Sequence, residues 1–243
     1  MTYNEKTIAT ISNVENCLIL RRENRFVVLV KNKEHVYRAL LRNTGKLRGI
    51  IEPGKKAVCL RKKEGKTQLN LVGVVDLDDL IAIVDTNLQE KIFQKSVENN
   101  ILRELQGCSV IGRNPKINDK SRLDFLLECH GEYAYVELKS AVMRGSDQIT
   151  ALYPDTPSDR GIKHMLLLLD LVSKGYRTYL IFIAGLPKVI RFSPNYSVDP
   201  RLKDIVPMLR RKGISLLSYR LYGIIINRDL NLHITTRSID LII

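Results

Sequence analysis

The 243-residue sequence contains no apolar run of 18 residues, which is the length that a membrane-spanning helix needs. Its first ten residues, MTYNEKTIAT, lack the apolar segment of a secretory signal peptide. We therefore expect a cytoplasmic protein with no membrane span. No stretch is of low complexity, and hydrophobic residues make up 44% of the chain. That share is enough for a packed core in one large domain or two smaller ones.

Cysteine is scarce and widely spaced. The four cysteines form no Cys-x-x-Cys pair, and no histidine stands at the spacing of a zinc site. This argues against structural zinc. Buried free thiols in a reducing compartment are the simplest interpretation. The four residues are Cys17, Cys59, Cys108 and Cys129.

Acidic residues are fewer than basic residues. The formal net charge is +13 and the isoelectric point is about 9.6. Residues 1–82 carry 16 Lys and Arg against nine Asp and Glu, so the first third is about twice as basic per residue as the rest. A surplus of this size favours a polyanionic partner, DNA or RNA. The alternatives are an ordinary basic surface and adaptation to heat by abundant Lys and Arg.

Five short apolar runs separated by turn residues predict an N-terminal domain over residues 1–82, an OB-like β-barrel that binds nucleic acid. The segment Asn43–Gly49, NTGKLRG, is not a Walker A motif, and we interpret it as a basic loop of the barrel. Only Phe26 and Tyr37 offer aromatic faces for stacking. The expected strands are 17–22, 26–30, 36–41, 57–61 and 69–75.

Residues 83–243 alternate helical and strand patterns, which predicts an α+β or α/β domain with a mixed sheet flanked by helices. A helix capped by Ser158 or Asp159 is expected to end near Lys174, and the apolar run 179–184 is expected to form a central strand. Further expected elements are a helix over 87–105, a helix over 199–211, a strand over 214–219 and a hairpin within 224–243.

Two short apolar runs, 122–127 and 135–139, each carry one carboxylate and predict a β-hairpin turning at 130–132. Alternation places Glu137 and Lys139 on one face, and Asp124 on the face of Arg122 and Leu126. Two carboxylates and an ammonium in one small space suit Mg²⁺ or Mn²⁺ and phosphodiester hydrolysis. The pattern D…ExK is short and common, so an ordinary exposed Glu–Lys pair remains the alternative.

Several spaced motifs resemble those of the sugar fermentation stimulation protein A (SfsA) family. They are RLDFLL at 122–127, VELKS at 136–140, YPD at 153–155 and DRGIKH at 159–164, together with earlier signatures at 43–45, 52–54 and 84–87. The resemblance covers most of residues 20–222. It implies an OB-like domain followed by a restriction-endonuclease-like domain of the PD-(D/E)xK fold, and a metal-dependent DNA/RNA nuclease.

When the functional residues of the family are carried over to the matching positions, the resemblance implies that Asp124 and Glu137 bind the metal. It also implies that Lys139 assists the attacking water. It implies that Arg160, Lys163 and His164 contact phosphate. In this chain Leu123 stands where the superfamily has proline, and Gln94-Lys95-Ser96 replaces an acidic motif, with Glu98 as the expected substitute. The full set expected to contact nucleic acid is Arg22, Arg25, Asn43, Lys46, Arg48, Arg122, Arg160, Lys163 and His164.

Two other functions fit the same features. One is a DNA-binding regulator that retains only the nuclease fold, and the other is a structural RNA-associated protein. A homodimer is also an option, because the C-terminal residues Ile239, Leu241, Ile242 and Ile243 are apolar and available for contact with a second copy.

Overall fold

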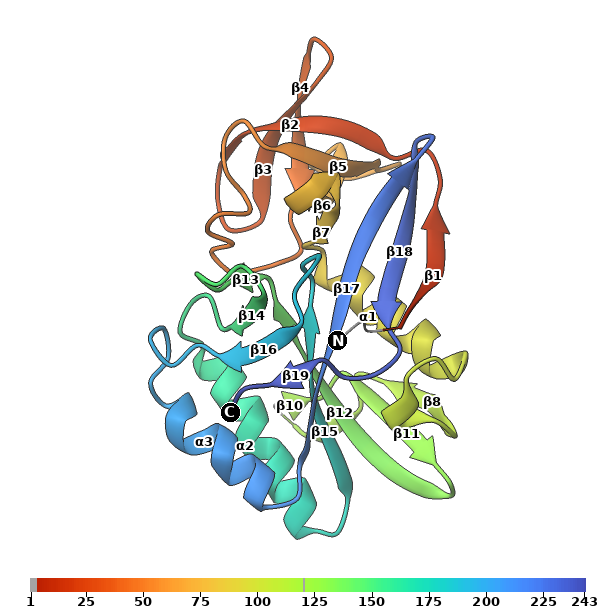
Figure 1. Ribbon diagram of the computed structural model, residues 1–243, viewed down its shortest axis with the longest axis vertical. Helices are drawn as coiled ribbons and strands as arrows, with labels where there is room; N and C mark the ends of the chain where they lie inside the picture. Colours follow the sequence, from red (N-terminus) through yellow and green to blue (C-terminus); the bar gives the residue numbers. More distant parts are fainter. Residues whose placement is uncertain (1–3, 120) are drawn as a thin grey trace.

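The computed structural model describes residues 4–119 and 121–243 and shows a small barrel above a larger mixed sheet (Figure 1). Five antiparallel strands form the barrel, and a parallel pairing of β4 with β6 closes it. All five strands were predicted from the sequence, and the OB-type barrel is confirmed. The barrel strands are β2 (Glu15–Arg22), β3 (Val27–Asn32), β4 (His35–Leu40), β5 (Lys56–Arg61) and β6 (Leu69–Val75).

Strand β17 (Ser215–Ile226) connects the two parts of the molecule. Its first half pairs in parallel with β15 (Arg177–Ala184) of the lower sheet, and its second half pairs with β7 (Ile81–Ile83) below the barrel. Strand β18 (Asp229–Thr235) folds back on β17, which confirms the predicted C-terminal hairpin. Strand β1 (Glu5–Ile11) pairs with β18 rather than with a barrel strand.

The lower sheet continues from β17 in the order β15, β12, β11 and β8. Parallel pairing joins β12, β15 and β17, and antiparallel pairing joins β12, β11 and β8. The sheet is therefore mixed, as predicted, with the expected central strand 179–184 inside β15. These strands are β8 (Cys108–Arg113), β11 (Phe125–Cys129), β12 (Glu132–Ala141) and β15 (Arg177–Ala184).

Helices cover both faces of this sheet (Figure 1). On one face Phe93 of α1 packs with Phe125 and Val136, and on the other Leu168 of α2 packs with Phe182. The first two helices begin at caps: the Asp85 side chain accepts from Leu88 N, and Ser158 Oγ accepts from Gly161 N. The helices are α1 (Thr86–Glu98), α2 (Asp159–Ser173) and α3 (Leu202–Arg211).

The first helix is shorter than predicted. It ends at Glu98, because Asn100 takes up a left-handed backbone conformation with φ of 53°. The apolar residues that extended the pattern to Leu105 lie in a loop and a short 3-10 helix (Arg103–Leu105), where Leu102 and Leu105 are still buried. A second 3-10 segment is Leu77–Asp79.

The remaining strands are short. One small sheet contains β13 (Met143–Arg144), β14 (Thr150–Tyr153), β16 (Arg191–Pro194) and β19 (Asp240–Leu241), and another contains β9 (Lys116–Asn118) and β10 (Ser121–Arg122). Pairing of β19 with β16 draws the C-terminus onto its own chain. Ile239 is buried, and Leu241 and Ile243 pack against the core. Only Ile242 is exposed, so the expected apolar surface for a second copy is not formed by this segment.

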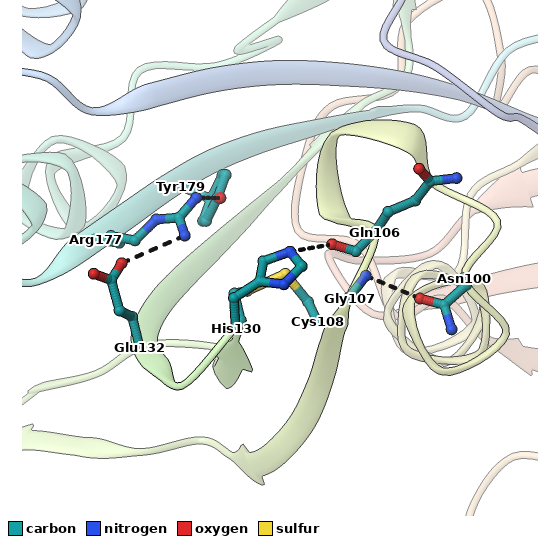
Figure 2. Close-up of a disulfide and its surroundings, with 9 residues drawn as sticks. Asn100, Gln106, Gly107, Cys108, His130, Glu132, Arg177 and Tyr179 are labelled. Atoms are coloured by element: carbon teal, nitrogen blue, oxygen red, sulfur yellow. Dashed lines mark hydrogen bonds and ion pairs between the residues drawn. A yellow bond between two sulfur atoms is a disulfide. The ribbon is translucent and has the colours of Figure 1, made fainter.

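The prediction of four free thiols is wrong for two of them. Cys108 on β8 and Cys129 on β11 lie directly opposite each other, with Cα atoms 4.0 Å apart, and form a disulfide (Figure 2). The sequence did not show that these strands pair. It therefore gave no sign that two cysteines with 20 residues between them lie close together. Cys17 and Cys59 are free and buried, as predicted.

No helix within the described part of the chain is long and apolar enough to cross a membrane.

Candidate metal and nucleic-acid site

The hairpin of β11 and β12 carries the candidate site at its open end. At the closed end His130 and Gly131, both with positive φ, form a two-residue turn between Cys129 and Glu132. Glu137 and Lys139 point to one face, as predicted, because the Lys139 Nζ atom donates to Glu137 Oε1 at 2.5 Å. The hairpin prediction is therefore confirmed.

Glu137 is almost completely enclosed, at 3% exposed. Its Oε1 atom also accepts a hydrogen bond from Nδ1 of His164 on α2, at 2.7 Å. Its Oε2 atom is buried and has no hydrogen-bond partner among the described residues. A carboxylate oxygen left in this state carries a desolvation cost, so it is a natural position for a ligand.

Asp124 lies immediately before β11 rather than on it. Its backbone N–H donates to Val136 O, and its Oδ2 accepts from Leu138 N at 2.7 Å. Both contacts tie Asp124 across the hairpin to the residues flanking Glu137. Burial and the neighbouring charge of Glu137 raise the pKa of Asp124 to about 7.

Glu137 and Lys139 form a charged pair. Burial opposes ionisation of Glu137, but the Lys139 ammonium and the hydrogen bond from His164 together lower the pKa of Glu137 below its usual value. Burial likewise opposes the charge of Lys139, yet Glu137 and weaker neighbours raise the pKa of Lys139. At neutral pH Lys139 is therefore an ammonium, able to hold or polarise an anion but not to accept a proton.

A third carboxylate, missed from the sequence, lies near the pair. Glu90 on α1 has a pKa raised by burial, with an opposing effect of Arg113 at 3.1 Å and a further rise from the charge of Glu137. The charge of Glu90 in turn raises the pKa of Asp124. The expected substitute, Glu98, is exposed and accepts from Gln94 instead.

The sequence contained a signal for Glu90. It lies three residues before the buried Phe93, so helical spacing puts both on one face of α1, whereas Glu98 follows the last buried residue of the helix, Val97. An acidic residue at the start of the buried stripe can reach the sheet, and one beyond its end cannot.

The side chains of this site supply some, but not all, of the ligands that a hard divalent cation needs. Asp124 and Glu137 supply oxygen donors, which Mg²⁺ and Mn²⁺ prefer, and Glu137 Oε2 is unengaged. Within residues 4–119 and 121–243, no three Asp, Glu, His or Cys side chains converge closely enough to hold a metal. Water or substrate oxygens would therefore complete the coordination, as is usual for Mg²⁺.

A cleft of about 440 Å³ runs from the barrel to Lys139. Asn43 joins the walls, because its Nδ2 donates to Val84 O and to Ser140 Oγ. Asp155 accepts from Leu47 N, and a side chain at position 45 would collide with its carboxylate, so Gly45 is required there. The residues that line this cleft include Phe26, Arg42, Asn43, Gly45, Lys139, Ser140, Tyr153, Asp155 and Arg160.

A second cleft of about 390 Å³ opens on the far side of Arg160. Arg122, Lys163 and His164 also line it, so four of the predicted phosphate contacts gather there. Arg122 donates to the backbone of Asn114, while Arg160 and Lys163 have no ion pair or hydrogen bond in the described structure. Arg160 lies at the boundary of both clefts.

The barrel residues expected to contact nucleic acid fall into two groups. Arg25, Lys46 and Arg48 are exposed. Arg22 instead binds backbone carbonyls, with its Nη1 atom 2.7 Å from Gly45 O, and Asn43 is 9% exposed. For Arg22 and Asn43 the described contacts are structural.

Two family models match this chain in the order of its two parts. The SfsA N-terminal OB domain matches residues 20–83, and the sugar fermentation stimulation protein RE domain matches residues 87–222. The chain belongs to the SfsA family.

Relatives in this family match over nearly their whole length. A sugar fermentation stimulation protein homolog of Pyrococcus furiosus is 42% identical over 212 residues, covering 87% of this chain and 90% of the relative. A homolog of Archaeoglobus fulgidus is 36% identical over 208 residues, covering 86% and 88%. The solved structure of Pyrococcus furiosus SfsA in complex with Ca²⁺ has a TM-score of 0.90 and 37% identity, covering 98% of this chain and all of that one.

Proposed function

We propose that this protein is a metal-dependent nuclease that hydrolyses phosphodiester bonds in DNA or RNA. The observation that carries the proposal is the buried Glu137 carboxylate, with one oxygen held by Lys139 and His164 and the other without a partner in the described structure. Beside it lies Asp124, whose pKa is raised by the same burial and charge. Such a concentration of perturbed charges is typical of catalytic sites.

Asp124 and Glu137 would hold a divalent cation, which activates water and offsets the charge on a phosphoryl oxygen. Lys139 contributes a fixed positive charge where negative charge develops in the transition state. His164 holds Glu137 in one orientation through its Nδ1 atom. The exposed cations of the barrel and of both clefts supply attraction for the phosphate backbone.

Calcium bound to the Pyrococcus furiosus relative supports a divalent cation in this fold. Ca²⁺ is a hard, oxygen-preferring ion, as are Mg²⁺ and Mn²⁺. Asp124 and Glu137 lie within the matched family domain, so we extend cation binding to them as part of the proposal.

The test is a cleavage assay with end-labelled single- and double-stranded DNA and RNA, in Mg²⁺, Mn²⁺ or EDTA. The wild type is compared with Lys139→Met and with Lys203→Met, a matched variant at an exposed position of α3. We expect metal-dependent cleavage in the wild type and in Lys203→Met, and none in Lys139→Met. Equal cleavage by all three proteins would contradict the site assignment.

A DNA-binding regulator with an inactive nuclease fold is the second candidate. It is favoured by one observation, namely that no cluster of three metal-binding side chains forms among the described residues. Salt-dependent binding of duplex DNA, together with no hydrolysis in any metal, would select this function over the nuclease.

A further inference from the structure

Phe26 is an exposed aromatic residue in the cleft that leads to Lys139. It lies in the turn that links β2 to β3, and the residue is 50% exposed. No other residue among the exposed large hydrophobics of the described structure lines this cleft. About half of this residue therefore stays in contact with water, which leaves apolar surface exposed.

The backbone around Phe26 is fixed. Its N–H donates to Asn24 Oδ1 at 2.8 Å, and its carbonyl accepts from Leu41 N at 2.8 Å. The Arg22 guanidinium joins this loop to the opposite one, because it donates to the carbonyls of both Arg25 and Gly45. The backbone that carries the ring is thus held in place before any ligand binds, which reduces the entropy lost on binding.

Three basic side chains line the cleft, namely Arg42, Lys139 and Arg160. Arg42 is paired with Asp85 and Lys139 with Glu137, which leaves Arg160 without an ion pair in the described structure. The acidic residue of the cleft, Asp155, accepts from Leu47 N. An aromatic face beside several cations matches a nucleotide strand, with its base on the ring and its phosphates on the cations. A base inside a duplex is covered on both faces by its neighbours, so only an unpaired base can occupy such a position.

We propose that Phe26 stacks on an unpaired base and directs single-stranded or locally unpaired nucleic acid to the site at Glu137 and Lys139. This inference rests on the proposed function, because it assumes a nucleic-acid substrate. It narrows that substrate class to strands whose bases are accessible at the cleft. The exposed ring of Phe26 then serves recognition rather than packing.

Binding in EDTA tests the inference without hydrolysis. Fluorescence anisotropy would compare a 12-nucleotide single strand, an abasic strand of equal length and charge, and a duplex closed at both ends. The proteins are the wild type, Phe26→Leu, Phe26→Trp and Tyr133→Leu. The last removes an aromatic ring at the start of β12, on a residue that is 57% exposed.

We expect the wild type to bind the base-bearing strand about tenfold more tightly than the abasic strand. Phe26→Leu should lose that advantage while binding of the abasic strand and the closed duplex is unchanged. Phe26→Trp and Tyr133→Leu should retain it. Equal binding of both single strands by the wild type would overturn the role of Phe26 and leave polyanion binding standing. Binding of neither strand nor duplex would overturn the proposed function as well.

Discussion

The two ends of the β11–β12 hairpin differ in what they contribute: the turn end is cross-linked, and the open end carries the candidate site. At the turn end, Cys129 is cross-linked to Cys108, and the His130 ring bonds to Gln106 O beside Gly107 (Figure 2). At the open end, Glu137 is buried with its charge balanced by Lys139 and the hydrogen bond from His164, whereas burial and the charge of Glu137 raise the pKa of Asp124. One end limits the conformations of the chain, and the other holds groups whose burial is costly.

This difference shows how one hairpin can combine stability with chemistry. A cross-link stabilises mainly by restricting the unfolded chain, and its contribution does not depend on what the open end contains. Buried carboxylates destabilise a protein unless they are paired or hold a cation. The closed end can therefore support an open end that would be unfavourable in isolation.

The largest expected effect is on cleavage activity, which should depend on the open end of the hairpin and not on the closed end. Glu137→Gln should lower metal-dependent cleavage by about a thousandfold, because it removes the charge that would hold the cation. The double variant Cys108→Ser/Cys129→Ser should cleave at the wild-type rate at temperatures where it remains folded. Steady-state cleavage assays measure both, and a large loss in the cysteine variant would show that the two ends are not independent.

Asp124→Asn should stabilise the metal-free protein. The pKa of Asp124 is raised from 3.8 to about 7 in the folded state, so its contribution to stability is lost as pH rises from about 4 to about 7. At pH 8 the cost is about 4 kcal/mol, and the neutral amide avoids it.

Denaturant unfolding at pH 5 and pH 8 in EDTA measures this effect. The advantage of Asp124→Asn over the wild type should be larger at pH 8 and should shrink on addition of Mg²⁺ to the wild type. An advantage that does not change with pH would mean that Asp124 titrates normally.

Loss of the disulfide should cost about 3 kcal/mol of unfolding free energy, from the loop that the two cysteines close over a separation of 21 residues. Denaturant unfolding of Cys108→Ser/Cys129→Ser against the oxidised wild type checks this value. Cys17→Ser, a substitution at a free cysteine in the barrel, is the control for replacing a buried thiol. A midpoint equal to that of the wild type would remove the disulfide as a stabilising element.

The smallest expected effect tests the third carboxylate. Glu90→Gln should lower the pKa of Asp124, because a negative charge beside it is removed, and should weaken cation binding by less than about tenfold. Glu98→Gln changes the same chemical group on the exposed side of α1 and should do neither. Calorimetric titration with Mn²⁺ compares the two, and equal effects would exclude Glu90 from the site.

Local patterns in the sequence were sufficient for much of this arrangement. The five barrel strands, the hairpin and the shared face of Glu137 and Lys139 follow from alternation and turn residues that lie next to each other in the chain. The cap of α2 at Ser158 was readable for the same reason. Together with the resemblance, these features indicated the family and both parts of its fold.

Contacts between distant segments were not readable. The Cys108–Cys129 disulfide depends on the pairing of β8 with β11, and Glu90 comes near the site only because α1 packs against β8 and β12. Arg22 looked like a phosphate ligand because sequence shows charge but not the carbonyls that occupy it. The apolar C-terminus looked available because its own partner, β16, lies about 50 residues earlier.

The account depends most on the electrostatic state of the open end of the hairpin. Carbon-13 NMR titration of the Asp124 carboxyl, assigned by comparison with Asp124→Asn, measures that state directly. We predict a midpoint near pH 7 without metal and a lower midpoint in Mg²⁺, since a bound cation favours the ionised form. A midpoint near pH 4 that Mg²⁺ does not move would contradict the account.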